Sequence, residues 1–282
     1  MTVTSPEGSV LVPIANPETA GRLLDSAIDI ARARSERIVV LHVVEVPPQL
    51  PLSEGDSLLD DEGSEERLLE SAVEQATEAG VPVDSRIRYA RDIATGIVSA
   101  VEDHDAGTLL TGWRGRPRRR DIVLGSFLDR ILGDAACDVI VKRIRRPSTE
   151  IDSVLVPVSE GPHAELAVDT AGAIAVQRNA SVRLLYVLSP DAPGAAESEA
   201  ETLIENSSSR LDGTAVDVES TVLRSDHVAG AVTDETPHHD LTVLGTTRDP
   251  FLGRKLVGSV AEGVGRAASS SVMLARKAER GE

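Results

Sequence analysis

Hydrophobic residues follow two alternating patterns along this chain. Short runs rich in Val, Ile and Leu have the composition of buried strands, whereas longer stretches place apolar residues three or four positions apart, as on one face of a helix. Helical spacing covers 20–31, 68–76, 93–101 and 127–132. The predicted strands are 10–14, 38–44, 83–89, 108–111 and 139–141 in the first half, and 154–158, 182–188, 216–222, 241–244 and 271–274 in the second.

Strands that alternate with helices predict an α/β fold. Such connections form right-handed crossovers, and the resulting parallel sheet is covered by helices on both faces. Ligands of these sheets bind beyond the carboxyl ends of the strands, where the strand order reverses. We therefore expect doubly wound, Rossmann-like sheets, with any ligand site at the carboxyl edge.

The two halves of the chain repeat each other. The segment Val-Leu-Val-Pro at 10–13 recurs 144 residues later at 154–157, and Leu-His-Val at 41–43 returns at the same distance as Leu-Tyr-Val. Each half has the size of one domain. The repeat predicts tandem domains at 1–147 and 148–282, joined by a charged linker near 145–150.

Glycines follow the fourth predicted strand at a suggestive spacing. The pattern Gly112-x2-Gly115-x9-Gly125-Ser126 begins where that strand ends and stops where a helix begins. Glycines allow the backbone to approach an anion, and the free N–H groups of a helix start can hold its charge. The spacing predicts a phosphate cradle, although turn and helix-start glycines would give the same residues.

The second half keeps only part of this pattern. Gly245, Gly258 and Ser259 lie 133 residues after their counterparts, but Arg248 replaces the middle glycine. We therefore expect the phosphate site in the first domain only. The shorter offset also implies an insertion in the first half at 45–63, which is rich in Pro and acids and is expected to be an exposed excursion.

These motifs resemble the universal stress protein (UspA) family. The likeness rests on the Val-Pro strand end, the glycine spacing, and the small-residue turn Ala135-Ala136-Cys137-Asp138. It spans both halves and implies two domains of the adenine nucleotide alpha hydrolase-like type. The implied ligand is ATP or AMP, with Mg²⁺ accompanying ATP.

The resemblance also implies which residues hold the nucleotide. Adenine would lie at the end of the first strand and the phosphates on the glycine loop. Nucleotide-binding members carry an Asp two residues after the first-strand Pro, where this chain has Ala15 and Ser159. The implied contacts, with no catalytic residue or metal ligand among them, are Pro13, Ile14, Ala15, Val43, Thr111, Gly112, Arg114, Gly115, Gly125, Ser126 and Phe127.

The sequence favours a nucleotide-binding stress-response or regulatory module over an enzyme, because no nucleophile–base set is visible. A slow ATPase or phosphotransferase and a nucleotide-independent scaffold are the alternatives. The opening at 12–17 and the acidic excursion resemble stress-protein domains attached to amino-acid permeases, which hints at a transporter partner. No apolar run is long enough to span a membrane and no signal peptide is seen, so we expect a cytoplasmic protein.

Charge narrows the range of partners. The net charge is −17 with a pI near 4.8, and only three lysines accompany the arginines. Such a composition is typical of proteins from a high-salt cytoplasm, although an acidic surface serving a partner would look the same. The negative field disfavours nucleic-acid binding. The single cysteine, Cys137, excludes an internal disulfide and is expected to be a small buried residue.

Several other residues have both a structural and a functional interpretation. The arginines of 114–120 could meet phosphates or an acidic partner, or balance nearby carboxylates. His42 could face adenine, but a hydrogen-bonded histidine within the sheet is the simpler interpretation. His238-His239-Asp240 could suggest metal ligands, but no third ligand stands at motif spacing, so a capping or surface role is expected. Asp92 and Asp226 are expected to be helix N-caps.

The last strand of each domain would leave an apolar edge. Pairing of the two domains through 139–141 and 271–274 would remove that liability, and the family resemblance implies the same pairing. We therefore expect an intramolecular domain pair, with homodimerisation as an open alternative.

Overall fold

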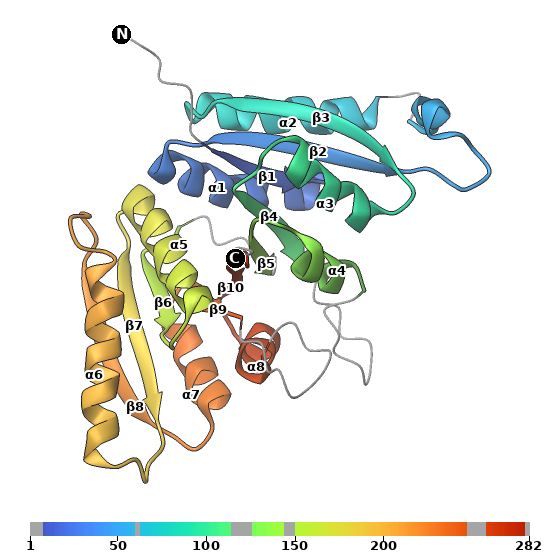
Figure 1. Ribbon diagram of the computed structural model, residues 1–282. Coiled ribbons are helices and arrows are strands. Elements are labelled where there is room, and N and C mark those ends of the chain that lie inside the picture. The colour runs from blue at the N-terminus through green and yellow to red at the C-terminus, as the bar shows by residue number, and fades with distance from the viewer. Residues whose placement is uncertain (1–7, 60–62, 114–125, 144–149, 247–257, 280–282) are drawn as a thin grey trace. The chain divides into compact units, whose positions relative to one another are not determined.

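The computed structural model describes residues 8–59, 63–113, 126–143, 150–246 and 258–279. The chain forms two compact units: the first comprises Met1–Ile140 with Ala278–Glu282, and the second is Val141–Lys277. Both are built from alternating strands and helices (Figure 1). The α/β class and the duplication predicted from the sequence are therefore confirmed.

The strands of the first unit follow the order β3-β2-β1-β4-β5, and β1 pairs in parallel with both β2 and β4. Helices α1 and α2 pack on each other, as do α3 and α4, so the connections fall into two layers. The strand order reverses between β1 and β4. The elements are β1 (Ser9–Pro13), α1 (Pro17–Arg34), β2 (Arg37–Glu45), η1 (Leu52–Leu58), α2 (Ser64–Glu78), β3 (Val83–Ala90), α3 (Ile93–Asp103), β4 (Thr108–Trp113), α4 (Ser126–Asp134) and β5 (Asp138–Arg143).

Local sequence explains how the connection from β1 to β2 is made. Val10, Leu11 and Val12 are fully buried in β1, as expected for a central parallel strand. Helix α1 begins after Asn16, whose side chain accepts from the Thr19 N–H. Proline fits the first helical position, because a backbone N–H there would have no partner within the helix. The helix ends at Ser35, which adopts the left-handed conformation (φ 57°).

The second unit repeats this plan with the strand order β8-β7-β6-β9-β10. Pro13 of β1 stands opposite Leu41, and Pro157 of β6 stands opposite Leu185, so the register is the same 144 residues later. The elements are β6 (Ser153–Pro157), α5 (Pro162–Arg178), β7 (Ser181–Leu188), α6 (Gly194–Ser209), β8 (Val218–Arg224), α7 (Val228–Glu235), η2 (Thr236–His238), β9 (Leu241–Gly245), α8 (Ser259–Ala267) and β10 (Ser271–Arg276).

The excursion at 45–63 is more ordered than its composition suggests. Most of its described residues are exposed, but it contains η1, in which Gly55 is buried. A Cβ on Gly55 would lie 2.4 Å from the Tyr89 ring, so glycine is what allows this segment to rest on β3. The Asp56 carboxylate of η1 is close enough to the Tyr89 hydroxyl to help raise its pKa.

One predicted cap is wrong. Asp92 caps α3 as expected, accepting from the Thr95 N–H at 2.9 Å. Asp226 does not cap α7, because the helix starts one residue later than the repeat implies, with His227 at the N-cap. The Ser225 hydroxyl instead accepts from the His227 N–H.

Candidate functional site at the carboxyl edge of the first unit

The strand order of the first unit reverses between β1 and β4, and their carboxyl ends mark the expected ligand position. Beyond Pro13 the chain stays fixed to the sheet, since the Ile14 N–H donates to the Leu41 carbonyl at 2.8 Å. Ile14 is buried and Ala15 is exposed. At the end of β4, Thr111 is buried while Gly112 is partly exposed. The backbone at this edge is thus rigid up to the point where it meets solvent.

His42 holds the neighbouring strand end. Its Nδ1 lies 3.0 Å from the Ile14 carbonyl oxygen. A carbonyl oxygen only accepts, so Nδ1 is the donor in this hydrogen bond. The histidine is therefore satisfied within the sheet, as the simpler interpretation predicted, and it fixes the carbonyl next to Ala15.

A second polar contact ties the helices together. Arg130 of α4 forms an ion pair with Asp92, the N-cap of α3, and also donates to the Thr95 hydroxyl. The Thr95 N–H is the largest of the influences that hold the pKa of Asp92 below its usual value, and Arg130 lowers it further. The contact fixes α4 against the start of α3.

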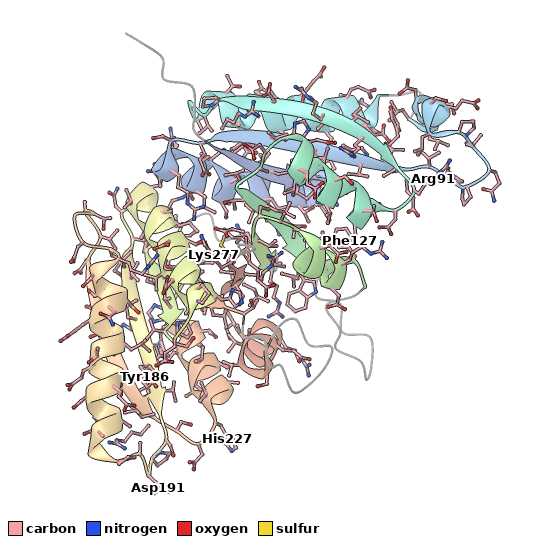
Figure 2. The ribbon with its side chains drawn as sticks, viewed as in Figure 1. Arg91, Phe127, Tyr186, Asp191, His227 and Lys277 are labelled. Atoms are coloured by element: carbon pink, nitrogen blue, oxygen red, sulfur yellow. The ribbon has the colours of Figure 1, made fainter. Side chains whose placement is uncertain are left out.

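The end of β3 is anchored at the same edge. Arg91, just beyond β3, donates to the carbonyls of Val46 and Pro47 at the end of β2. Figure 2 shows Arg91 at this strand end and Phe127 at the start of α4. Both connections therefore keep the carboxyl edge in a defined shape.

The structure describes some of the predicted contact residues and leaves others outside the described ranges. The structure brings Pro13, Ile14, Ala15, Thr111 and Gly112 to the carboxyl ends of adjacent strands β1 and β4. Phe127 lies in the first turn of α4, which begins at Ser126. The remaining loop residues Arg114, Gly115 and Gly125 lie outside the described residues, as do Arg248 and the rest of the arginine cluster.

Val43 is placed differently from the others. A Cβ on Gly96 of α3 would lie 2.9 Å from Val43 Cγ1 and 2.8 Å from the Ala90 side chain. The Val43 side chain therefore packs beneath α3, and Gly96 is needed there because the helix approaches the sheet so closely. Any ligand contact at this position would fall to the backbone of Val43.

The start of α5 packs closely against the end of β9 in the second unit. A Cβ on Gly245, at the end of β9, would lie 2.6 Å from the Ala164 nitrogen and from the His163 carbonyl carbon. The His163 Nδ1 accepts from the Lys277 N–H at 2.9 Å, beyond the end of β10. Close packing of the α5 start thus accounts for the glycine at 245 without a ligand.

Arg130 and Arg91 were missed by sequence reasoning. Arg130 is one charged residue within an amphipathic helix, and Asp92 lies 38 residues earlier, so no local pattern joins them. His42 was noted, but its partner Ile14 could be found only from the pairing of β1 with β2.

Two other candidates have structural roles. Asp240 Oδ2 accepts from the N–H groups of Asp152 and Ser153 at the start of β6, so it ties a strand start and caps no described helix. Cys137 is buried, as expected. Within the described part of the chain, no cluster of His, Cys, Asp and Glu could hold a metal, and no helix has the length and apolar composition to cross a membrane.

Comparisons with known proteins agree with this architecture. The chain matches the model of the universal stress protein family over 8–143 and again over 150–276. It is 26% identical to the Na(+)/H(+) antiporter NhaS5 of Synechocystis sp. over 97% of this chain and 39% of the antiporter, so it spans about two-fifths of that relative.

Solved structures show the same fold. A universal stress protein from Archaeoglobus fulgidus DSM 4304 has a TM-score of 0.68 at 17% identity, covering 96% of this chain and 97% of that chain. The cytoplasmic domain of a prokaryotic cation chloride cotransporter has a TM-score of 0.66 at 18% identity, covering 96% of each chain.

Proposed function

Since the chain belongs to the universal stress protein family, we propose that it is a regulatory module whose first unit binds an adenine nucleotide, ATP or AMP. The observation that carries the proposal is the junction at the strand reversal of that unit. There, β4 ends at Trp113 and α4 starts at Ser126, and the segment between them carries the Gly115 and Gly125 positions of the phosphate pattern.

Electrostatics at this junction favour a phosphate. The first N–H groups of a helix have no partner within the helix, and its dipole places partial positive charge there. The ion pair between Arg130 and Asp92 fixes α4, so these donors are held in place before a ligand arrives. Pre-organised donors lower the entropy lost on binding.

The base would lie beside β1 and β2. Ile14 is buried there, Ala15 is exposed, and His42 holds the carbonyl between them. Ala15 supplies no carboxylate, so a nucleotide would lose the contact that the usual Asp makes. We infer that binding rests mainly on the phosphate end, and that Mg²⁺ would accompany ATP through its phosphates.

Packing gives Gly245 a role that needs no ligand. In the second unit the start of α5 lies against Gly245, and a Cβ there would lie 2.6 Å from its backbone. We therefore place the nucleotide in the first unit, where the glycine pattern is complete.

Titration calorimetry with ATP and AMP tests the proposal. Gly125→Val should remove binding, because a branched side chain would occupy the approach of a phosphate oxygen and restrict the backbone. Each lost charge-assisted hydrogen bond contributes about 1.5–3 kcal/mol, so affinity should fall a hundredfold or more. Gly258→Val, at the matching position of the second unit, is the control and should leave the stoichiometry at one.

Arg114→Ala separates the backbone cradle from the basic loop. It removes one contact and should weaken binding less than Gly125→Val does. Both variants are titrated at the same salt after their melting curves are compared with the parent. A Gly125→Val protein that binds normally while Arg114→Ala does not would make the arginines the anion site. If the parent binds two equivalents of nucleotide and each glycine variant binds one, the proposal of a single site is wrong.

The same titration addresses the alternatives. A chain that binds neither nucleotide is a scaffold with empty sites. A chain that binds ATP and releases phosphate on repeated turnover is an enzyme. We expect binding without turnover, because the Asp92 carboxylate beside the Thr95 hydroxyl caps α3 and is paired with Arg130.

A transporter is the second element of the proposal. Its support is the similarity to the antiporter NhaS5, which extends over 97% of this chain. We propose that the chain regulates a cation transporter in response to nucleotide. The matching part of that antiporter can be replaced by this chain, and antiport measured in vesicles with and without ATP. Transport that depends on ATP, and loses this dependence in Gly125→Val, would support the role. Transport that changes neither with ATP nor with Gly125→Val would contradict it.

A further inference from the structure

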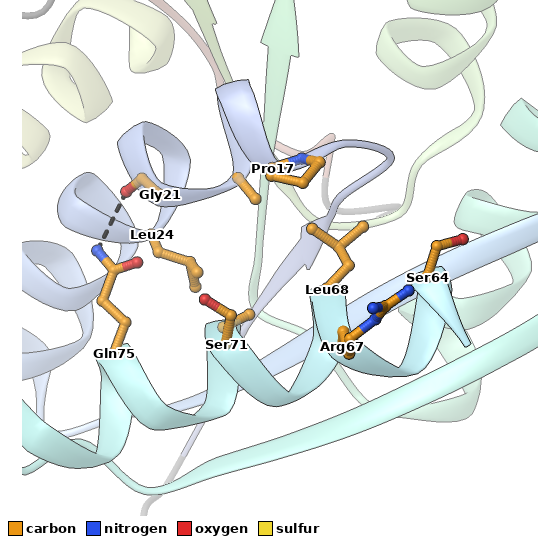
Figure 3. A pocket seen from close by; sticks show the side chains of 10 residues that line it. Pro17, Gly21, Leu24, Ser64, Arg67, Leu68, Ser71 and Gln75 are labelled. Carbon is orange, nitrogen blue, oxygen red and sulfur yellow. Dashed lines mark hydrogen bonds between the residues drawn. The ribbon is translucent and has the colours of Figure 1, made fainter. Parts of the chain in front are cut away.

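A cavity of about 320 Å³ lies between α1 and α2 of the first unit (Figure 3). It shares no lining residue with the proposed nucleotide contacts. Its volume falls within the range of small-molecule pockets. The lining residues are Pro17, Ala20, Gly21, Leu24, Ser64, Arg67, Leu68, Ser71, Ala72 and Gln75.

The lining divides into an apolar floor and a polar rim. Ala20, Leu24, Leu68 and Ala72 form the floor and are buried. The rim carries the hydroxyls of Ser64 and Ser71 and the guanidinium of Arg67, all on α2. This division matches a molecule with an apolar body and a polar end.

Gly21 keeps the gap between the helices open. The nearest atom to a Cβ placed there would be Gln75 Oε1, at 3.6 Å. Gln75 closes one end by donating to the Gly21 carbonyl and to Asp25, at 3.2 and 2.8 Å. The helices are thus joined at this end by one amide, and no side chain from position 21 enters the space beside it.

The corresponding positions of the second unit carry a different set of contacts. Glu165 stands 144 residues after Gly21, and Asp169 stands at the same distance from Asp25. Arg210 binds both carboxylates, with an Nη1 to Glu165 distance of 3.3 Å and an Nη2 to Asp169 distance of 2.6 Å. The glycine beside the cavity therefore belongs to the first unit and is not a general feature of the repeat.

Arg67 can receive an anion at the rim. Its Nε donates to the Gly63 carbonyl at 3.2 Å, which fixes the side chain along α2. Among the described residues, its guanidinium makes no ion pair with a carboxylate. Asp25, Glu65 and Glu66 lie on the same two helices, so a ligand with several negative charges would be repelled.

We propose that this cavity binds a small amphipathic monoanion, with its apolar body on the floor and its carboxylate or sulfonate beside Arg67. The site is separate from nucleotide binding. A nucleotide with several negative charges fits poorly. The carboxylates of α1 and α2 would repel it, and the single guanidinium of Arg67 does not offset them.

The probes are 1-anilinonaphthalene-8-sulfonate, followed by fluorescence, and octanoate as its competitor. The full chain should bind one equivalent of the dye, and octanoate but not ATP should displace it. Gly21→Leu should reduce dye affinity at least tenfold by filling the gap, and a leucine is well tolerated within a helix. Arg67→Gln should weaken binding about fivefold, whereas Arg86→Gln, at an exposed arginine of β3, is the control and should have no effect.

Each other outcome overturns the proposal. Dye binding that is unchanged in Gly21→Leu would place the probe elsewhere, and displacement by ATP would place it at the nucleotide site. Equal losses in Arg67→Gln and Arg86→Gln would mean a non-specific charge effect. Absence of dye binding to the parent chain would also refute it. Gly125→Val should keep full dye affinity, so failure of the nucleotide proposal leaves this result interpretable.

Discussion

At the scale of single residues, His42 links two strand ends. The hydrogen bond from its Nδ1 to the Ile14 carbonyl is partly buried. His42→Leu removes the donor and leaves that carbonyl without this partner, which should cost about 1–2 kcal/mol in the free energy of unfolding. Nucleotide affinity should also fall, because Ile14 and Ala15 lose a restraint. Denaturant unfolding and calorimetry measure the two effects.

Tyr186 offers the matched control for this variant. It occupies the position in β7 that His42 occupies in β2. Tyr186→Phe should leave nucleotide affinity unchanged, since it alters the second unit. Equal losses of affinity in both variants would show that His42 acts only through general stability.

Tyr89 reports whether the excursion is attached to β3. Burial and the hydrogen bond with Asp56 raise the pKa of Tyr89 to about 12. The folded state therefore holds this proton more tightly than the unfolded chain. The raised pKa therefore contributes to the free energy of unfolding. This contribution is present in full below the ordinary tyrosine pKa near 10 and is lost as the pH rises towards 12.

Absorbance of tyrosinate measures this pKa directly. The titration is done in a Tyr186→Phe background, where Tyr89 is the remaining tyrosine. Adding Asp56→Asn should move the midpoint towards 10, because a neutral amide no longer opposes ionisation. A midpoint near 10 in the background protein itself would mean that η1 does not rest on the ring.

At the scale of elements, the contact between α3 and α4 places the helix that starts the proposed phosphate site. Arg130→Leu removes the ion pair with Asp92. The side chains of both residues are nearly half exposed. Such pairs contribute about 0.2–1 kcal/mol, so the melting temperature should change little. Nucleotide affinity should fall severalfold, since the donors at the start of α4 are no longer fixed.

The control for Arg130 is another exposed helical arginine. Arg266 pairs with Glu262 within α8 of the second unit, at 2.8 Å. Arg266→Leu should leave nucleotide affinity as in the parent. If Arg130→Leu binds nucleotide as tightly as Arg266→Leu does, the contact between α3 and α4 has no part in the site.

At the scale of the whole molecule, a net charge of −17 produces self-repulsion that salt should relieve. The melting temperature should rise steeply between about 0.02 and 0.5 M KCl and then flatten, since the screening length falls to about 3 Å at 1 M. Sucrose stabilises without screening, so it serves as the control for excluded-solute effects. A melting temperature independent of KCl over this range would show that the acidic surface does not limit stability.

Several features of the fold followed directly from local sequence. The predicted strands of both halves are present. The central ones are continuous apolar runs because they are buried on both faces, whereas the edge strands β3 and β8 are partly exposed and carry polar residues. The repeat of Val-Leu-Val-Pro corresponds to the equal register of β1 and β6. The expectation for Asp226 failed because helix starts shift by a residue without altering the apolar pattern.

The sequence by itself therefore determined the alternation of strands and helices, the duplication, and the strand–glycine–helix order at the candidate phosphate site. The tertiary structure decided which residues meet there. His42 reaches Ile14 across 28 residues, and Arg130 reaches Asp92 across 38. It also decided that the start of α5 packs closely against Gly245 and that a cavity opens beside Gly21, between α1 and α2. Periodicity records which face of an element is buried, whereas these contacts depend on strand order and helix spacing, which only the folded chain fixes.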